Sequence, residues 1–154
     1  MRREPVPGAA IVAEARRWRG VPWRHLGRSR AGLDCVGLLV VIARALELPH
    51  RDLTGYSRHG QPEPDGDGLP ADVAEHFRAQ LGEIRCAEAR PGDVLVFAQT
   101  VRPCHAGVLS EVRGAAHLVH AHAGRRVVLE EPMAGVWAAR LRLAFRFPDM
   151  RGGS

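Results

Sequence analysis

Hydrophobic residues change their spacing near residue 90, and this change divides the chain into a helical part and a strand part. Before residue 90, apolar side chains recur at the spacing of helices. The predicted helices cover residues 9–19, 36–48 and 70–81. After residue 90, short apolar or alternating runs bounded by turn residues are typical of strands. The predicted strands cover residues 94–98, 105–112, 117–123, 127–131 and 141–147. This order predicts an α+β fold, with N-terminal helices packed on a C-terminal antiparallel sheet.

Two of these elements have a pattern that predicts how they are buried. The run 36–48 carries only two charges, Arg44 and Glu47, so this helix should be apolar on nearly every side and lie in the middle of the domain. The last strand alternates apolar and polar residues, and side chains of a strand point to opposite faces in turn. One face of that strand should therefore carry Leu141, Leu143, Phe145 and Phe147.

The length of 154 residues favours a single domain, which we place at residues 1–150, with a flexible tail at 151–154. Residues 50–70 are polar and rich in Gly, Pro and Asp, so we expect a long surface loop there. No apolar run reaches the roughly 18 residues that span a membrane. The N-terminus lacks the hydrophobic region of a secretory signal, so we expect a protein made in the cytoplasm that needs another carrier to act outside it.

Charge and cysteine content narrow the function classes. The chain has a formal net charge of +5, and because it contains no lysine, all of its basic side chains are arginines. These arginines are scattered and do not form a basic run interleaved with aromatic residues, so we do not expect a nucleic-acid partner. A diffuse positive charge also suits an anionic polymer such as cell wall. The three cysteines, Cys35, Cys86 and Cys104, have irregular spacing and predict no disulfide framework.

Cys35 lies where a thiol can become a nucleophile. It follows Asp34, a residue that favours the N-cap position, and it begins the buried helix. The unpaired amides and the dipole of a helix start favour an anion, so we expect the thiolate to be stabilised there. The alternative is that Cys35 is a small buried apolar residue, which is the commoner state of a free cysteine.

A nucleophilic thiol needs a base, and the strand part supplies histidines for this role. His105 opens an apolar strand, and His120 and His122 share one face of the next strand, whereas His117 is on the other face. A polar group on the hairpin partner could hold the base in one tautomer, as in other triads. Papain-type sites often use asparagine there, but this chain has none, so His120 is the best available group. The remaining histidines lie in loop or helix sequence: His25, His50, His59 and His76.

Five short motifs in this order resemble the NlpC-type cysteine peptidases, which are papain-like cell-wall hydrolases. They are Trp-Arg-Gly-Val-Pro-Trp at 18–23, Asp-Cys-Val-Gly-Leu-Leu at 34–39, Pro-Gly-Asp before the 94–98 strand, His-Ala-Gly-Val-Leu at 105–109, and Val-His-Ala at 119–121. The match spans roughly residues 9–147. The Asp-Cys-Val-Gly variant and the ending Ala-Phe-Arg-Phe-Pro at 144–148 look most like the subgroup encoded with phage tails and gene transfer agents.

This resemblance implies the roles of the residues. Cys35 would be the nucleophile, His105 the base and acid, and His120 the polar third member, with His117 as the competitor for the third place. The implied substrate is the stem peptide of peptidoglycan, cleaved between a D-glutamyl residue and the following diamino acid, without a metal or an organic cofactor. The implied partners are phage-tail or tail-tip proteins, and the implied place of action is the cell wall in the periplasm.

Two other function classes remain open on the sequence. A zinc-binding hydrolase could use thiol and imidazole ligands, although the chain has no His-Glu-x-x-His and no Cys-x-x-Cys. Its candidate ligands are Cys104, His105, His117, His120 and His122. A structural tail component with the same fold and little hydrolytic activity is the second alternative.

Overall fold

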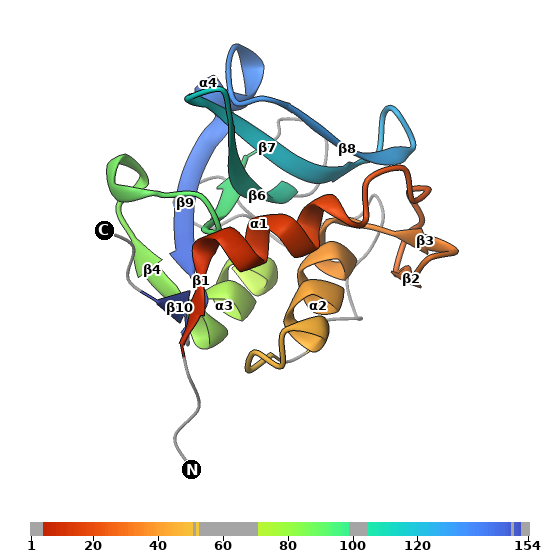
Figure 1. Cartoon of the computed structure of the whole chain (residues 1–154), viewed down its shortest axis with the longest axis horizontal. Helices are drawn as coiled ribbons and strands as arrows, with labels where there is room; N and C mark the ends of the chain where they lie inside the picture. Colours follow the sequence, from red (N-terminus) through yellow and green to blue (C-terminus); the bar gives the residue numbers. More distant parts are fainter. Residues whose placement is uncertain (1–4, 51, 53–70, 99–104, 149, 152–154) are drawn as a thin grey trace.

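The structure, a computed structural model, describes residues 5–50, 52, 71–98, 105–148 and 150–151. Within them, an antiparallel sheet of six strands forms the centre, in the order β4-β9-β5-β6-β7-β8 (Figure 1). These strands are β4 (Gly82–Ile84), β5 (Val94–Phe97), β6 (His105–Val112), β7 (Ala115–His122), β8 (Val127–Pro132) and β9 (Leu141–Arg146). The helices are α1 (Gly8–Arg16), α2 (Cys35–Ala45), α3 (Ala71–Gln80) and the short α4 (Val136–Arg140), with one 3-10 turn at Cys86–Glu88. The predicted α+β fold is confirmed.

Helix α2 forms where its sequence predicts it. The Asp34 side chain accepts a hydrogen bond from the Gly37 amide at 2.8 Å, which caps the first turn as expected. Every residue from Val36 to Ala43 is buried, because α2 packs against α1 and against strands β6 and β7. The apolar run is therefore the central element of the core.

The two faces of the sheet bury different amounts of apolar surface. On one face, α1, α2 and α3 cover a large core that includes Ile11, Leu38 and Phe145. On the other face, a smaller cluster gathers around Trp137 of α4 and contains Leu95, Phe97, Leu109, Leu118 and Ala144. We call these the helix face and the Trp137 face.

Glu130 ties α1 to the helix face of the sheet. Its side chain is 7% exposed and accepts hydrogen bonds from Arg16 Nε at 3.1 Å, Arg19 Nη1 at 3.1 Å and Ser110 Oγ at 2.6 Å. Burial alone would raise the pKa of this carboxyl, but the bonds from Arg16 and Ser110 and the arginine charges outweigh burial and lower the pKa. A buried acid with this many donors stays ionised and fixes the helix on the strand.

The Pro-Gly-Asp turn before β5 has a structural role. Gly92 has φ +100°, and a Cβ there would lie 2.6 Å from the Cα of Gly8, so α1 begins directly against this turn. Asp93, fully buried, accepts two hydrogen bonds from Arg146, at 2.9 and 2.8 Å, and one from the Arg90 amide at 2.8 Å. These contacts join the turn to α1 and to β9.

The predicted faces of the last strand need one correction. Leu143, Phe145 and Phe147 lie in the helix-face core as expected, but Leu141 packs against the Trp137 cluster. The pairing of β5 with β9 shifts register between Val96 and Phe97, so the alternation breaks before Leu143. A register shift is set by the partner strand, which one strand's own pattern does not reveal.

Several short elements were not expected from the sequence. Strand β4 follows α3 where only a helix stop was predicted, and β2 (Arg28–Ser29) pairs with β3 (Gly32–Leu33) in the loop before α2. Strand β1 (Val6–Pro7) pairs in parallel with β10 (Met150–Arg151), so Arg151 lies in a strand and residues 152–154 lie outside the described residues. Of the expected 50–70 loop, only residues 50 and 52 are described.

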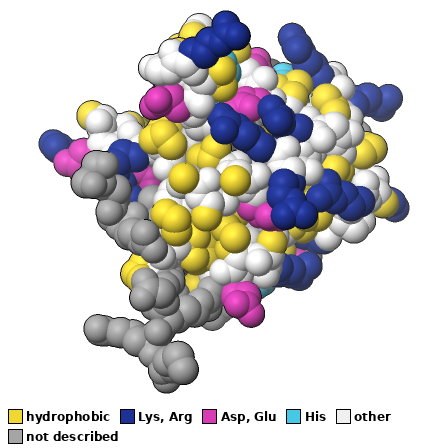
Figure 2. Space-filling view, viewed as in Figure 1, with side chains coloured by type: hydrophobic (Ala, Val, Ile, Leu, Met, Phe, Trp, Pro, Cys, Tyr) yellow, Lys and Arg dark blue, Asp and Glu magenta, His cyan; other side chains and the backbone are white. Residues whose placement is uncertain are grey.

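The surface is mixed rather than striped on the face seen in Figure 2. Arginine side chains there form separate groups with acidic and apolar side chains between them. None of the described helices is long and apolar enough to cross a membrane.

Candidate active site

The start of α2 brings the Cys35 thiol beside the beginning of β6. Cys35 is half-buried and packs against the helix-face core. The backbone amides of Ala106 and Val36 act on the Cys35 sulfur in the direction that favours the thiolate. Ala106 directly follows His105, so the predicted nucleophile and the predicted base lie at neighbouring points of the structure although 70 positions (105 − 35) separate them in sequence.

The resting thiol is more basic than the sequence predicts. Burial, followed by the negative charge of Asp34, raises the pKa of Cys35 to about 12. The amides of Ala106 and Val36 and the charge of Arg28 act in the opposite direction but do not compensate. The expectation of a thiolate stabilised at the helix start is therefore wrong for the chain without substrate. Burial destabilises the thiolate of Cys35 more than the helix start stabilises it.

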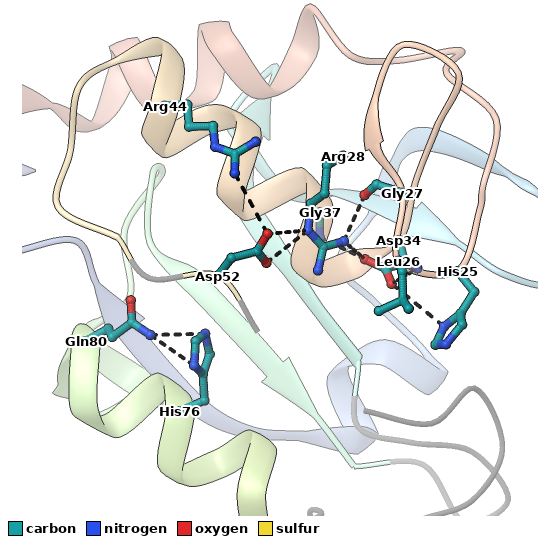
Figure 3. A network of polar contacts seen from close by, with 10 residues as sticks. All are labelled: His25, Leu26, Gly27, Arg28, Asp34, Gly37, Arg44, Asp52, His76 and Gln80. Carbon is teal, nitrogen blue, oxygen red and sulfur yellow. Dashed lines mark hydrogen bonds and ion pairs between the residues drawn. The ribbon is translucent and has the colours of Figure 1, made fainter. Parts of the chain in front are cut away.

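Asp34 is the centre of the polar network drawn in Figure 3. Its Oδ1 accepts from Arg28 Nη1 at 2.9 Å, and its Oδ2 accepts from the Leu26 amide at 2.8 Å. Arg28 also donates to both oxygens of Asp52, at 3.0 and 3.1 Å, and the ring of His25 lies 4.0 Å from Asp34. This network fixes the loop before α2 and so holds the position of Cys35.

Three side chains form a continuous hydrogen-bonded chain on the Trp137 face. His105 Nε2 lies 2.6 Å from His120 Nδ1, and His120 Nε2 lies 2.6 Å from Glu131 Oε2. His120 is fully buried and His105 is 9% exposed. Gly107 leaves the room that this pair needs, because a Cβ at that position would lie 2.9 Å from the Cβ of His120.

Burial keeps these two imidazoles neutral. Desolvation, followed by the charges of His120 and His122, holds the pKa of His105 well below its ordinary value, although Glu131 acts the other way. Desolvation, with His122 and Arg125, lowers the pKa of His120 to about 3. Neutral rings with one N–H each can form the ordered chain that the distances show.

Trp137 covers the histidines. Its ring centroid lies 5.2 Å from that of His105, 4.8 Å from that of His120 and 5.8 Å from that of His122. Phe97 completes the wall, at 5.3 Å from Trp137 and 6.1 Å from His105. Stacked and edge-on aromatic contacts of this kind fix ring orientation and exclude water from the imidazoles.

The other described histidines take no part in the two hydrogen bonds of this chain, although the His122 ring packs against it. His117 is on the opposite side of β7, paired with Ser110 and Pro132, and its Nδ1 contacts the Ala115 carbonyl at 3.1 Å. His122 lies on the same face as His120, with the ring centroids 5.2 Å apart. His76 contacts Gln80, and His50 contacts the Leu48 carbonyl. His59 and Cys104 lie outside the described residues.

Cys35 and His105, the predicted nucleophile and base, belong to different faces of the sheet. Cys35 packs with the helix face, and the His105 ring contacts the Trp137 face. Among the described residues, no hydrogen bond joins the Cys35 sulfur to the His105 ring, and His105 Nδ1 has no hydrogen-bond partner. Nδ1 is thus the nitrogen of His105 that remains available to take a proton.

Comparison with protein families identifies the chain. The NlpC/P60 family model matches residues 20–146. The chain belongs to the NlpC/P60 family. This assignment confirms the family resemblance and the predicted enzyme class, a cysteine peptidase of the peptidoglycan-hydrolase type. A comparison with curated proteins gave no match.

Solved structures share the fold at low sequence identity. The NlpC/P60 domain of the peptidoglycan hydrolase SagA is 23% identical with a TM-score of 0.60, covering 92% of this chain and 100% of that one. The peptidoglycan hydrolase RipB from Mycobacterium tuberculosis is 16% identical with a TM-score of 0.60, covering 90% of this chain and 63% of that one. An NlpC/P60 family protein from Bacillus cereus is 16% identical with a TM-score of 0.65, covering 93% of this chain and 41% of that one. The NlpC/P60 chain thus spans less than half of the Bacillus cereus chain.

Two site residues, Glu131 and Trp137, were missed by the sequence analysis. Glu131 could have been found from the turn at 124–126, because antiparallel pairing across it puts His120 opposite Leu129, and Glu131 then shares their face. Trp137 gave no comparable signal, since α4 has five residues and no measurable periodicity. Within the described part of the chain, no group of three His, Cys, Asp or Glu side chains is arranged to hold a metal ion.

Proposed function

We propose that this NlpC/P60 protein is a cysteine endopeptidase that hydrolyses the stem peptides of peptidoglycan next to a D-glutamyl residue. Cys35 is the nucleophile, His105 the general base and acid, and His120 the polar third member. The observation that carries the assignment is the His105–His120 hydrogen bond at 2.6 Å, which leaves Nδ1 of His105 without a hydrogen-bond partner among the described residues. His105 directly precedes Ala106, whose amide acts on the Cys35 sulfur.

The reaction follows from these positions. His105 Nδ1 takes the proton of the Cys35 thiol as the sulfur attacks the amide carbonyl of the substrate. The oxyanion accepts hydrogen bonds from amides at the start of α2, including that of Cys35. The protonated His105 then gives its proton to the leaving amine, and the C–N bond breaks to leave a thioester. Water, deprotonated by His105, hydrolyses the thioester and restores the thiol.

The raised pKa of Cys35 changes how the first step proceeds. A thiol with a pKa of about 12 beside a neutral imidazole rests as a neutral pair, not as a thiolate–imidazolium pair. Proton transfer then accompanies attack, and a bound peptide that displaces water increases the benefit of the amide donors.

We also propose that the protein works as part of a phage-like tail. The sequence features that support this are the Asp-Cys-Val-Gly helix start and the Ala-Phe-Arg-Phe-Pro ending. Such a particle would carry a protein made in the bacterial cytoplasm to the cell wall in the periplasm. Its partners there would be tail-tip proteins and the peptidoglycan itself.

Digestion of purified peptidoglycan tests the proposed function. The wild type should release muropeptides whose masses correspond to cleavage after D-glutamate, and Cys35→Ala should release none above background. Cys86→Ala is the matched control, because Cys86 lies in the 3-10 turn that contacts β9 and not at the start of α2, so the products should be unchanged. Iodoacetamide should abolish activity and EDTA should not; loss on chelation alone would contradict the thiol mechanism in favour of the zinc alternative.

Failure to hydrolyse has a distinct meaning. Two results together would support the structural tail component in place of the enzyme. The folded wild type would release no muropeptides, and particles carrying Cys35→Ala would still penetrate the wall. Particles that lose penetration with Cys35→Ala, while Cys86→Ala particles keep it, support the enzyme.

A further inference from the structure

Glu131 ends the hydrogen-bonded chain that begins at His105, and nothing else in the described residues accounts for its position. Its Oε2 lies 2.6 Å from Nε2 of the fully buried His120, while its own side chain is 23% exposed. Among the described residues, His120 is its one hydrogen-bond partner. Its neighbour Glu130 contacts Arg16, Arg19 and Ser110 instead, so the ties between α1 and the sheet do not involve Glu131.

The hydrogen bonds along this chain can run in one direction only while Glu131 is ionised. A carboxylate accepts hydrogen bonds and donates none, so the hydrogen of neutral His120 must be on Nε2. Nδ1 of His120 is then an acceptor, and the 2.6 Å contact requires His105 to carry its hydrogen on Nε2. Nδ1 of His105 is left with a lone pair.

We propose that Glu131 is a positioning residue that sets the tautomer of both histidines and thereby keeps Nδ1 of His105 ready to accept the Cys35 proton. This inference rests on the proposed function for its catalytic meaning, but the tautomers themselves exist without substrate. If His120 carried its hydrogen on Nδ1, it would donate to Nε2 of His105, and the hydrogen of His105 would occupy the nitrogen needed as base.

Glu131 also bears on the charged intermediate. When His105 becomes an imidazolium, it still donates through Nε2 to His120, and the negative charge of Glu131 lies at the end of the chain. That charge acts on His105 in the direction that favours its protonated form. Glu131 thus has two separable effects, on the direction of the hydrogen bonds and on the charge of the base.

Nitrogen NMR of the imidazoles tests the first effect without any activity measurement. Long-range ¹H–¹⁵N spectra at neutral pH distinguish protonated from unprotonated ring nitrogens, and His105→Gln and His120→Gln variants assign the signals. In the wild type, Nε2 should be protonated and Nδ1 unprotonated in both rings. In Glu131→Ala, both rings should become mixtures of tautomers. A wild-type His120 with its hydrogen on Nδ1, or spectra unchanged by Glu131→Ala, would overturn the proposal.

Kinetics on a soluble stem peptide test the consequence. Glu131→Ala should lower kcat roughly 10- to 100-fold and change KM by less than about twofold, as removal of an orienting partner behind a functional histidine does. Glu131→Gln keeps an acceptor oxygen without the charge, so its kcat should fall less than that of Glu131→Ala. Glu111→Gln is the matched control, because Glu111 is an exposed acid on β6.

The two proposals fail separately. An inactive wild type with both Nε2 nitrogens protonated would reject the peptidase and keep the tautomer assignment. An active wild type whose kcat is unchanged in Glu131→Ala would keep the peptidase and reject the role of Glu131. If Glu131→Ala does not fold, the wild-type spectrum and Glu131→Gln decide the question.

Discussion

The two faces of the central sheet hold the two proposed catalytic groups, Cys35 and His105, in different ways. On the helix face, Cys35 is held by a large apolar core and by the capped start of α2. On the Trp137 face, a small cluster holds His105 together with a chain of polar contacts. The helix face thus places its group by packing, whereas the Trp137 face depends on hydrogen bonds whose direction matters.

This difference makes Cys35 and His105 sensitive to different kinds of substitution around them. Packing of a large core fixes the Cys35 backbone, but it also removes water from the sulfur and raises the pKa of Cys35. The Trp137 face also removes water from its imidazoles, and His105 and Glu131 each have His120 as their one side-chain hydrogen-bond partner among the described residues. Substitutions of these polar groups should therefore affect mainly activity, and substitution of Asp34 should affect mainly thiol reactivity.

The largest expected effect separates two histidines on opposite sides of β7. His120→Ala should lower kcat on the order of 1000-fold, because His105 loses the acceptor that orients it. His117→Ala should change kcat by less than about twofold, since His117 contacts only the Ala115 carbonyl among the described residues. Steady-state kinetics on a stem peptide measure both. Equal losses in the two variants would remove the distinction between the faces.

Removal of Trp137 should follow in size. Trp137→Ala should lower the free energy of unfolding by about 3 kcal/mol, because a side chain that is 9% exposed is replaced by a cavity beside three histidines. Urea denaturation measures this change. Trp18→Ala, at a half-buried residue on the helix face, is the control and should cost less. A larger decrease in the free energy of unfolding for Trp18→Ala would contradict the importance assigned to the Trp137 face.

Acid should destabilise the chain through the Trp137 face. The pKa of His120 is lowered to about 3, and that of His105 lies well below its ordinary value. The unfolded chain therefore binds protons that the folded chain does not, so stability is complete above about pH 6.5 and decreases as the pH falls toward the folded values. Each ring should contribute about 1.4 kcal/mol per pH unit in that range.

Urea denaturation between pH 4 and pH 7 measures this slope. A folded His120→Gln variant should lose the contribution of one imidazole to this slope, whereas His117→Ala should keep the full slope. A free energy of unfolding that is independent of pH in this range would show that the two buried rings bind protons in the folded chain.

The smallest expected effect is on the helix face. Asp34→Asn keeps an acceptor for the Gly37 amide but removes a negative charge that raises the pKa of Cys35, so alkylation by iodoacetamide should become several-fold faster at fixed pH. In the wild type, the alkylation rate should rise about tenfold per pH unit from pH 6 to pH 9 without a plateau. A plateau near neutral pH would show a resting thiolate instead.

The sequence predicts those parts of the molecule that local chemistry determines. Asp34 caps α2 and β6 begins at His105, as expected, because a capping side chain and an alternating strand leave a signal within a few residues. Burial of Cys35 and the face of Leu141 depend on elements far away in sequence, and the predictions for the pKa of Cys35 and the place of Leu141 were wrong for that reason. Glu131 was missed although it lies across one hairpin from His120.

The adjacent acids of β8 also make the alignment of that strand chemically specific. Glu130 points to the helix face and Glu131 to the Trp137 face, so a displacement by one residue would keep an acid at only one of the two positions. Displacement one way would put Pro132 in the place of Glu131, and displacement the other way would put Leu129 in the place of Glu130. Val128, which is 1% exposed, would leave the core, and its backbone bonds to Gly20 and Val21 would break. A deletion in the 124–126 turn should therefore yield a misaligned hairpin that loses an acid contact together with hydrophobic burial.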